Sequence, residues 1–199
     1  MKDNLYKEGE EHFSCLSSYG YKVAHRISIM KRFYKYIVSD ITKSEKTKIL
    51  DIGSGTGYVL VNLAKNNEQI EGVGIDPSQY MVNIGNKLAR KVGVENRVKF
   101  QLGSSRALPE GNFELAYSTL SFHHWADREK ALSDILAHLK DHGEFRIYEF
   151  NKDKLYFPIT LARAHTLSRD DLNNIALNAN VPVSEIKEYD VYISAIFKK

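Results

Sequence analysis

Three glycines at alternate positions, Gly53, Gly55 and Gly57, follow an apolar stretch at residues 48–52 that is typical of a buried parallel strand. Glycine lacks the Cβ atom that would keep a ligand away from the backbone. The helix predicted over residues 58–66 directs its free N–H groups and the positive end of its dipole at the same place. Such loops at the carboxyl end of a strand bind nucleotide-like ligands in open α/β sheets.

An acidic residue, Asp76, ends the second predicted strand, residues 70–76. A carboxylate in this position can accept charge-assisted hydrogen bonds from both hydroxyls of a ribose. Pro77 suits the first turn of the helix that follows, which apolar spacing extends to about Val92. The alternative is that Asp76 only caps this helix.

Two adjacent histidines, His123 and His124, follow the fourth predicted strand, residues 113–120. Either could act as a base or an orienting group near neutral pH. Adjacent side chains are expected to point in different directions, which disfavours a metal site built on the pair. The alternative is that a histidine caps or packs the turn.

The order of these motifs resembles that of the class I S-adenosylmethionine-dependent methyltransferases. Residues 51–57 (DIGSGTG) resemble the first motif of that family. Residues 121–127 (SFHHWAD) resemble the fourth motif of its small-molecule branch, which includes quinone-biosynthesis enzymes. The dinucleotide fingerprint fits less well, because it requires glycine where Tyr58 stands.

The resemblance implies an α/β, Rossmann-like fold. Its mixed sheet would have seven strands in the order 3-2-1-4-5-7-6, with the last strand antiparallel and helices on both faces. The final two strands are expected at residues 182–189 and 191–197. We expect residues 1–199 to form a single methyltransferase domain, with residues 1–45 as an N-terminal helical lid and residues 46–199 as the cofactor-binding core.

The resemblance also implies where S-adenosylmethionine would bind. Pro77 and Met81 would flank the adenine. The carbonyls of Ser118 and Thr119, at the carboxyl end of the fourth strand, would face the methionine part. Family members usually carry aspartate where Ser104 stands, so the backbone N–H of Ser105 is expected to contribute more here. The full set of expected cofactor-binding residues is Asp51, Gly53, Ser54, Gly55, Gly57, Asp76, Pro77, Met81, Gly103, Ser104, Ser105, Ser118 and Thr119.

The implied reaction is in-line attack of a small-molecule acceptor on the sulfonium methyl group, which leaves S-adenosylhomocysteine. The protein mainly has to align the two reactants and exclude water, so no metal is required. A base is needed only if the acceptor must lose a proton, and His123, His124 or Tyr19 could serve. Three alternatives stay open: a non-catalytic or partner-dependent module of this fold, a protein methyltransferase, and a nicotinamide-dependent oxidoreductase.

Composition limits the other classes of function. The chain has 28 basic and 25 acidic residues and a net charge of +3, which is too small an excess to indicate nucleic acid or an anionic membrane as partner. The single cysteine, Cys15, excludes an internal disulfide and a cysteine-built metal site. Neither a signal peptide nor a membrane-spanning run is visible, so we expect a cytoplasmic protein, monomeric or homodimeric.

Overall fold

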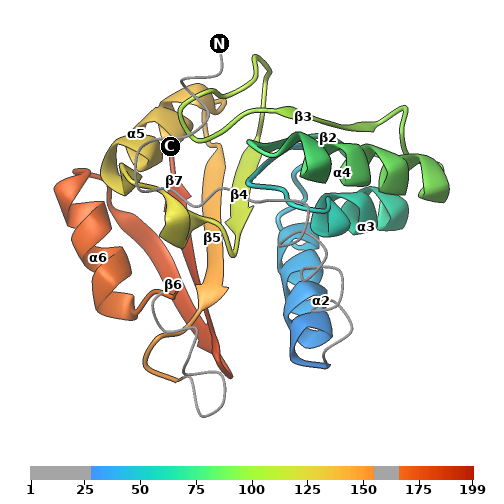
Figure 1. Ribbon diagram of the computed structural model, residues 1–199. Coiled ribbons are helices and arrows are strands. Elements are labelled where there is room, and N and C mark those ends of the chain that lie inside the picture. Colours follow the sequence, from blue (N-terminus) through green and yellow to red (C-terminus); the bar gives the residue numbers. More distant parts are fainter. Residues whose placement is uncertain (1–27, 155–165) are drawn as a thin grey trace. The chain divides into compact units, whose positions relative to one another are not determined.

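The computed structural model of the protein describes residues 28–154 and 166–199. Its seven strands follow the order β3-β2-β1-β4-β5-β7-β6, which confirms the predicted Rossmann-like topology (Figure 1). The chain divides into two compact units, residues 1–111 and 112–199. The division into a lid at residues 1–45 and a core at residues 46–199 stays a prediction.

The first unit contains three parallel strands and the helices between them. The strands are β1 (Lys48–Ile52), β2 (Glu71–Asp76) and β3 (Val98–Leu102), with β2 pairing with both of the others. The helices are α2 (Ser28–Thr42), α3 (Tyr58–Asn66) and α4 (Gln79–Val92). Helix α3 packs against both α2 and α4. The predicted bounds of the first strand and of the helix after the glycine loop are confirmed.

Helix α2 forms because its apolar residues recur on one face. Phe33, Ile37 and Ile41 are fully buried, whereas Lys31 and Lys35 face solvent. This spacing of three to four residues is that of an amphipathic α-helix. The helix therefore supplies one apolar side to the core of the first unit.

A phenylalanine fills the space that three glycines leave open in the first unit. Phe100 of β3 is buried, and a Cβ atom built on Gly57, Gly74 or Gly85 would lie 2.3, 2.3 or 2.7 Å from an atom of its ring. Asn86 of α4 holds the same residue by its backbone, accepting from the Phe100 N–H at 3.0 Å and donating to the Phe100 carbonyl at 2.8 Å. Phe100 thus joins the glycine loop, β2 and α4.

The second unit contains the other four strands. Strand β4 (Leu115–Thr119) pairs in parallel with β5 (Glu144–Phe150), and β7 (Tyr192–Lys198) pairs antiparallel with both β5 and β6 (Val183–Tyr189). Helix α5 (Arg128–His138) packs against β5 and against α6 (Arg169–Asn178), which lies alongside β6 (Figure 1). The short 3₁₀-helix η1 (Phe122–His124) follows β4.

The hairpin between β6 and β7 has a two-residue turn without glycine. Tyr189 and Tyr192 are its last register partners, and Asp190 in the turn adopts the left-handed conformation with φ +54°. Aspartate tolerates this conformation better than most residues. The predicted antiparallel pair is confirmed, with bounds that differ from the prediction by one residue.

Candidate active site

The glycine loop is fastened to the end of β2 by backbone hydrogen bonds. The N–H groups of Gly53 and Ser54 both donate to the carbonyl of Ile75 at 2.9 Å, and the Gly57 N–H donates to the Ser54 carbonyl at 2.9 Å. Gly53, Gly55 and Gly57 have φ values of +73°, +52° and +74°. Glycine adopts this left-handed region without the steric cost that a Cβ atom adds, so it is the favoured residue at all three positions.

The glycines at positions 55 and 57 serve different purposes. A Cβ atom on Gly55 would meet no atom of the described residues within 4 Å, so its face of the loop is open to a ligand. The missing Cβ atom of Gly57 instead makes room for the Phe100 ring. The ring of Phe100 thus explains why position 57 is glycine, and the expected cofactor contacts of Gly55 and Gly57 stay predictions.

The carboxylate of Asp76 lies beside the open part of the loop. Its Oδ2 atom accepts a hydrogen bond from the Gly55 N–H, and its Oδ1 atom accepts one from the Ser78 N–H, both at 2.9 Å. Each carboxylate oxygen can accept a second hydrogen bond, so capacity for a ligand donor remains. The carboxylate therefore orders the loop and presents a charged acceptor next to it.

Burial sets the charge state of this carboxyl group. Removal from water raises the pKa of Asp76 from 3.8 to about 6. The hydrogen bonds from Ser78 and Gly55 act in the opposite direction because they stabilise the anion, but their effect is smaller. Asp76 is therefore mostly ionised at neutral pH and becomes protonated under mildly acidic conditions.

The start of helix α4 differs from the prediction. The helix begins at Gln79 with Ser78 as its N-cap, so Pro77 precedes the cap instead of lying in the first turn. The cause is Asp76, whose carboxylate accepts the Ser78 N–H and ends the strand in a turn. Met81 is buried on the inner side of α4. The adenine contacts expected of Pro77 and Met81 stay predictions.

The other expected cofactor residues of the first unit lie at the same ends of β1 and β3. Asp51 is buried at the end of β1, and the buried Ser54 hydroxyl has no hydrogen-bond partner among the described residues. Gly103 lies close against β2, since a Cβ atom there would lie 2.9 Å from Cβ of Ile75. The Ser54 hydroxyl is the polar group that a ligand could satisfy.

Ser104 helps to close the turn after β3. Its hydroxyl oxygen accepts the Arg106 N–H at 3.3 Å, and its backbone bridges to Ala107. Ser105 beside it is buried. The side chain of Ser104 thus has a local structural partner. The predicted adenine contacts of Ser104 and Ser105 remain untested.

In the second unit, β4 ends in two buried hydroxyl groups. The side-chain oxygens of Ser118 and Thr119 have no hydrogen-bond partner in residues 28–154 and 166–199. Leu120 follows with φ +49°, an unusual value for a branched side chain. Buried polar atoms without partners and backbone outliers are uncommon and often mark functional sites. Their predicted role toward the methionine part of the cofactor remains a prediction.

His123 is held by a carboxylate that the sequence analysis did not identify. The Nδ1 atom of His123 lies 2.8 Å from Oε2 of Glu149, and the His123 N–H donates to Oε1 at 3.3 Å. The side chain of Glu149 is fully buried and that of His123 is 7% exposed. A signal was present, because Glu149 shares one face of β5 with Phe145 and Ile147, where an apolar residue is expected.

The two histidine rings do not point in different directions, and that expectation was wrong. The ring centroids of His123 and His124 are 3.9 Å apart at an interplanar angle of 48°, and both residues lie in η1. Among the described residues no group of three or more His, Cys, Asp or Glu side chains could hold a metal ion. Tyr19, the third candidate base, lies outside the described residues.

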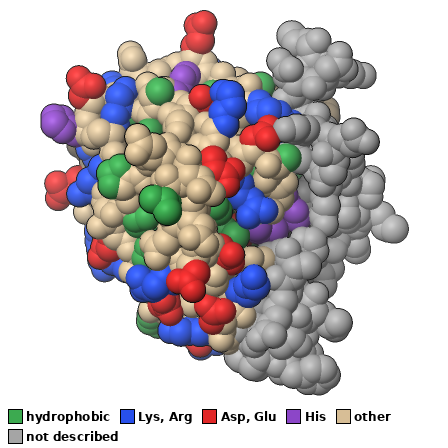
Figure 2. All heavy atoms as spheres, turned by 90° about the vertical axis from the view of Figure 1, so that its left-hand side faces the viewer, with side chains coloured by type: hydrophobic (Ala, Val, Ile, Leu, Met, Phe, Trp, Pro, Cys, Tyr) green, Lys and Arg blue, Asp and Glu red, His purple; other side chains and the backbone are tan. Residues whose placement is uncertain are grey.

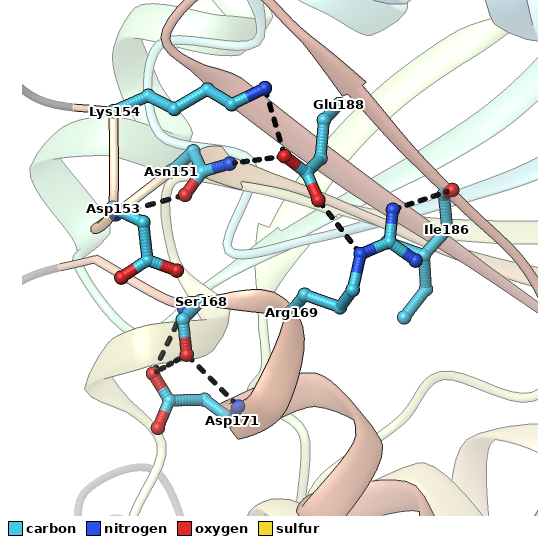
Figure 3. Close-up of polar contacts among 8 residues, drawn as sticks. All are labelled: Asn151, Asp153, Lys154, Ser168, Arg169, Asp171, Ile186 and Glu188. Atoms are coloured by element: carbon cyan, nitrogen blue, oxygen red, sulfur yellow. Dashed lines mark hydrogen bonds and ion pairs between the residues drawn. The ribbon is translucent and has the colours of Figure 1, made fainter.

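A second polar cluster surrounds Glu188 of β6 (Figure 3). Its carboxylate receives Lys154 at 2.9 Å, Arg169 Nε at 2.8 Å and Asn151 Nδ2 at 3.2 Å. Lys154 and Arg169 lower the pKa of Glu188. A carboxylate neutralised in this way is a poor base. The contacts of the cluster instead connect Asn151, Lys154 and the start of α6 to β6.

The surface of the described residues carries charges of both signs. Figure 2 shows Lys and Arg side chains interspersed with Asp and Glu side chains over the face that it displays. In the described ranges, no helix combines the length and the apolar character needed to cross a membrane.

Comparison with known proteins identifies the family. A family described as a methyltransferase domain matches residues 43–192. Sterol 4-C-methyltransferase of Caenorhabditis elegans is 28% identical over 129 residues, or 64% of this chain and 38% of that protein. The ubiquinone/menaquinone biosynthesis C-methyltransferase UbiE of Geotalea uraniireducens is 28% identical over 130 residues, or 64% of this chain and 55% of that protein. The solved structure of a SAM-dependent methyltransferase from Aquifex aeolicus matches with a TM-score of 0.75 at 20% identity, covering 94% of this chain and 99% of that one.

The chain belongs to the methyltransferase domain family, since that match covers most of its length. It spans between 34% and 56% of the length of the curated relatives with which it aligns.

Proposed function

We propose that this protein binds S-adenosylmethionine and transfers its methyl group to a small-molecule acceptor, leaving S-adenosylhomocysteine. The observation that carries the proposal is the open face of the loop at Gly55 beside the strand-end carboxylate of Asp76. Family membership supports the same class of reaction. A cytoplasmic location, and a monomeric or homodimeric state, are part of this proposal.

The residues of the first unit fit the adenosyl group of this cofactor. The Asp76 carboxylate would accept the ribose hydroxyls, and the Ser54 hydroxyl, which is buried and has no partner among the described residues, could satisfy a polar group of the ligand. Gly55 leaves space for the backbone to approach it. When bound, the cofactor supplies a methyl group that its positive sulfur already activates.

The roles proposed for the other site residues follow from the resemblance to class I S-adenosylmethionine-dependent methyltransferases. Pro77, Met81, Gly103, Ser104 and Ser105 would contact the adenine. Ser118 and Thr119 would contact the methionine part, and Asp51 would also contact the cofactor. His123 is the proposed base where the acceptor has to lose a proton, in preference to His124 and Tyr19.

The acceptor is proposed to be a small organic molecule. One relative is named as a sterol 4-C-methyltransferase and another as a ubiquinone/menaquinone biosynthesis C-methyltransferase. These names favour a small acceptor over a protein or a nucleic acid. The acceptor atom is a carbon, an oxygen or a nitrogen.

Isotope transfer tests the proposal. The full chain is incubated with S-adenosylmethionine carrying a deuterated methyl group and with a metabolite extract, and the small-molecule and protein fractions are analysed by mass spectrometry. We expect the label in a small molecule together with release of S-adenosylhomocysteine. Label in the protein fraction would instead support a protein methyltransferase, and no transfer despite cofactor binding would support a non-catalytic or partner-dependent module.

Cofactor affinity should depend on pH through Asp76. The ionised carboxylate is the better acceptor for ribose hydroxyls, and its pKa in the folded chain is about 6. Affinity for S-adenosylmethionine should therefore be constant above pH 7 and fall by up to about tenfold per pH unit below pH 6. Calorimetric titration between pH 5 and pH 8 measures this dependence.

The stability of the unliganded chain should respond to the same group with the opposite sign. Because the folded pKa lies above the unfolded one, the folded state takes up a proton first as the pH falls from about 6 toward 3.8. The contribution of Asp76 to the free energy of unfolding thus increases in the window where binding weakens. An Asp76→Asn variant should lose both dependences, and a wild-type affinity that stays flat down to pH 5 would contradict the assignment.

A further inference from the structure

We propose that Glu149 positions His123 as the base for methyl transfer, and that the acceptor atom therefore carries a proton before it is methylated. This inference rests on the proposed function. It adds a residue that the motifs do not contain, and it narrows the acceptor to hydroxyl groups, N–H groups or acidic C–H groups.

The contact between the two residues is built into the interior of the second unit. Glu149 lies near the end of β5 next to the buried Tyr148, and its side chain is fully buried. Both of its carboxylate oxygens contact the same residue, one at the His123 backbone N–H (3.3 Å) and one at Nδ1 (2.8 Å). A buried carboxylate is costly unless it is satisfied in this way.

The contact at Nδ1 defines the chemistry of the ring. An ionised carboxylate can only accept, so Nδ1 carries the hydrogen and Nε2 is the nitrogen with a lone pair. When Nε2 takes up a proton, the carboxylate behind the ring stabilises the positive charge. A helix cap or a packing contact would need only the backbone hydrogen bond, whereas the ring contact also fixes the tautomer.

The turn that carries His123 is held from several sides. Leu120 adopts φ +49° and its N–H donates to the Tyr148 carbonyl at 3.0 Å. Trp125 Nε1 donates to the Ser121 hydroxyl at 3.2 Å. The fully buried Phe122 ring packs against the Trp125 ring, with 4.9 Å between the ring centroids. A left-handed leucine is strained, and such strain is retained where the surrounding structure imposes it. The turn therefore fixes the backbone on which His123 is mounted.

Nε2 of His123 removes the proton from the acceptor atom, and the electron pair left on that atom forms the new bond to the methyl carbon. The carbon–sulfur bond of the sulfonium breaks, and its electron pair remains on sulfur. The products are the methylated acceptor, neutral S-adenosylhomocysteine and the His123 imidazolium next to the Glu149 carboxylate. The imidazolium then releases its proton to solvent.

Nitrogen NMR of the 199-residue chain tests whether Glu149 positions the His123 ring. The ring signals of His123, assigned by their loss in His123→Gln, should show the Nδ1–H tautomer in the wild type, with a downfield Nδ1 proton. Glu149→Gln should shift that proton upfield and mix the two tautomers, while the matched surface change Glu185→Gln should leave it unchanged. A wild-type ring in the Nε2–H tautomer would overturn the proposal without any variant, so it does not depend on whether Glu149→Gln folds.

Kinetics separates positioning from structure. The kcat is measured with the small molecule that takes up the label in the isotope experiment. Glu149→Gln should lower this kcat by at least about tenfold, since general bases contribute about 10²–10⁴-fold to reaction rates. Affinity for S-adenosylmethionine, measured by calorimetry, should stay within twofold. An unchanged kcat would overturn the role of Glu149, whereas absence of cofactor binding to the wild type would instead count against the proposed function.

Discussion

Replacing Phe100 with alanine should lower the free energy of unfolding by about 3–5 kcal/mol, a large share of the about 5–15 kcal/mol that stabilises a typical domain. The ring occupies the space between Gly57, Gly74 and Gly85, so its removal leaves a cavity lined by backbone that cannot move inward. Gly57 ends the glycine loop, and the cavity should therefore also loosen the cofactor site.

Urea unfolding measures this loss. Phe100→Leu should give an intermediate value, because leucine fills part of the space. Leu177→Ala is a suitable control, since Leu177 is 77% exposed and its truncation should change stability by less than about 0.5 kcal/mol. A loss below about 1 kcal/mol for Phe100→Ala would show that the three glycines are not explained by this ring.

Replacing Asp76 with alanine should weaken the affinity for S-adenosylmethionine at least about tenfold. Hydrogen bonds to a charged group contribute about 1.5–3 kcal/mol, and the variant loses the ribose acceptor. It also releases the N–H groups of Gly55 and Ser78, which the carboxylate holds at 2.9 Å. The loss should thus exceed that of a contact made to the ligand alone.

Two further variants show whether the effect belongs to the site. Asp76→Asn keeps one oxygen acceptor and should bind more tightly than Asp76→Ala, but less tightly than the wild type. Glu71→Ala removes a carboxylate from the opposite end of the same strand, where it forms an exposed ion pair with Lys48, and should bind like the wild type. Equal affinity of Asp76→Ala and the wild type would remove the ribose assignment.

The sequence indicated the elements whose signals are local. An apolar run followed by the glycine loop predicted β1 and α3 with their observed bounds, because strand, loop and helix signals are adjacent there. The resemblance to the methyltransferase family predicted the strand order of the sheet. Helix α4 started later than predicted because the Asp76 side chain, and not the intrinsic preference of Pro77, fixes its first turn.

The contacts that the sequence did not indicate join distant residues. Gly57 and Phe100 meet only when β3 is placed next to β2, and no local pattern assigns a ring to a glycine. Glu149 reaches His123 from the neighbouring strand, so its role depends on the pairing of β4 with β5. The unexpected packing of the two histidine rings depends on η1, a three-residue turn too short to predict.

Calorimetric titration of the wild-type chain with S-adenosylmethionine, S-adenosylhomocysteine and NAD tests the central claim most directly. We expect one site for each of the first two ligands with micromolar affinity, which corresponds to about −8 kcal/mol, and no binding of NAD. Binding of NAD without binding of S-adenosylmethionine would contradict the account and favour an oxidoreductase.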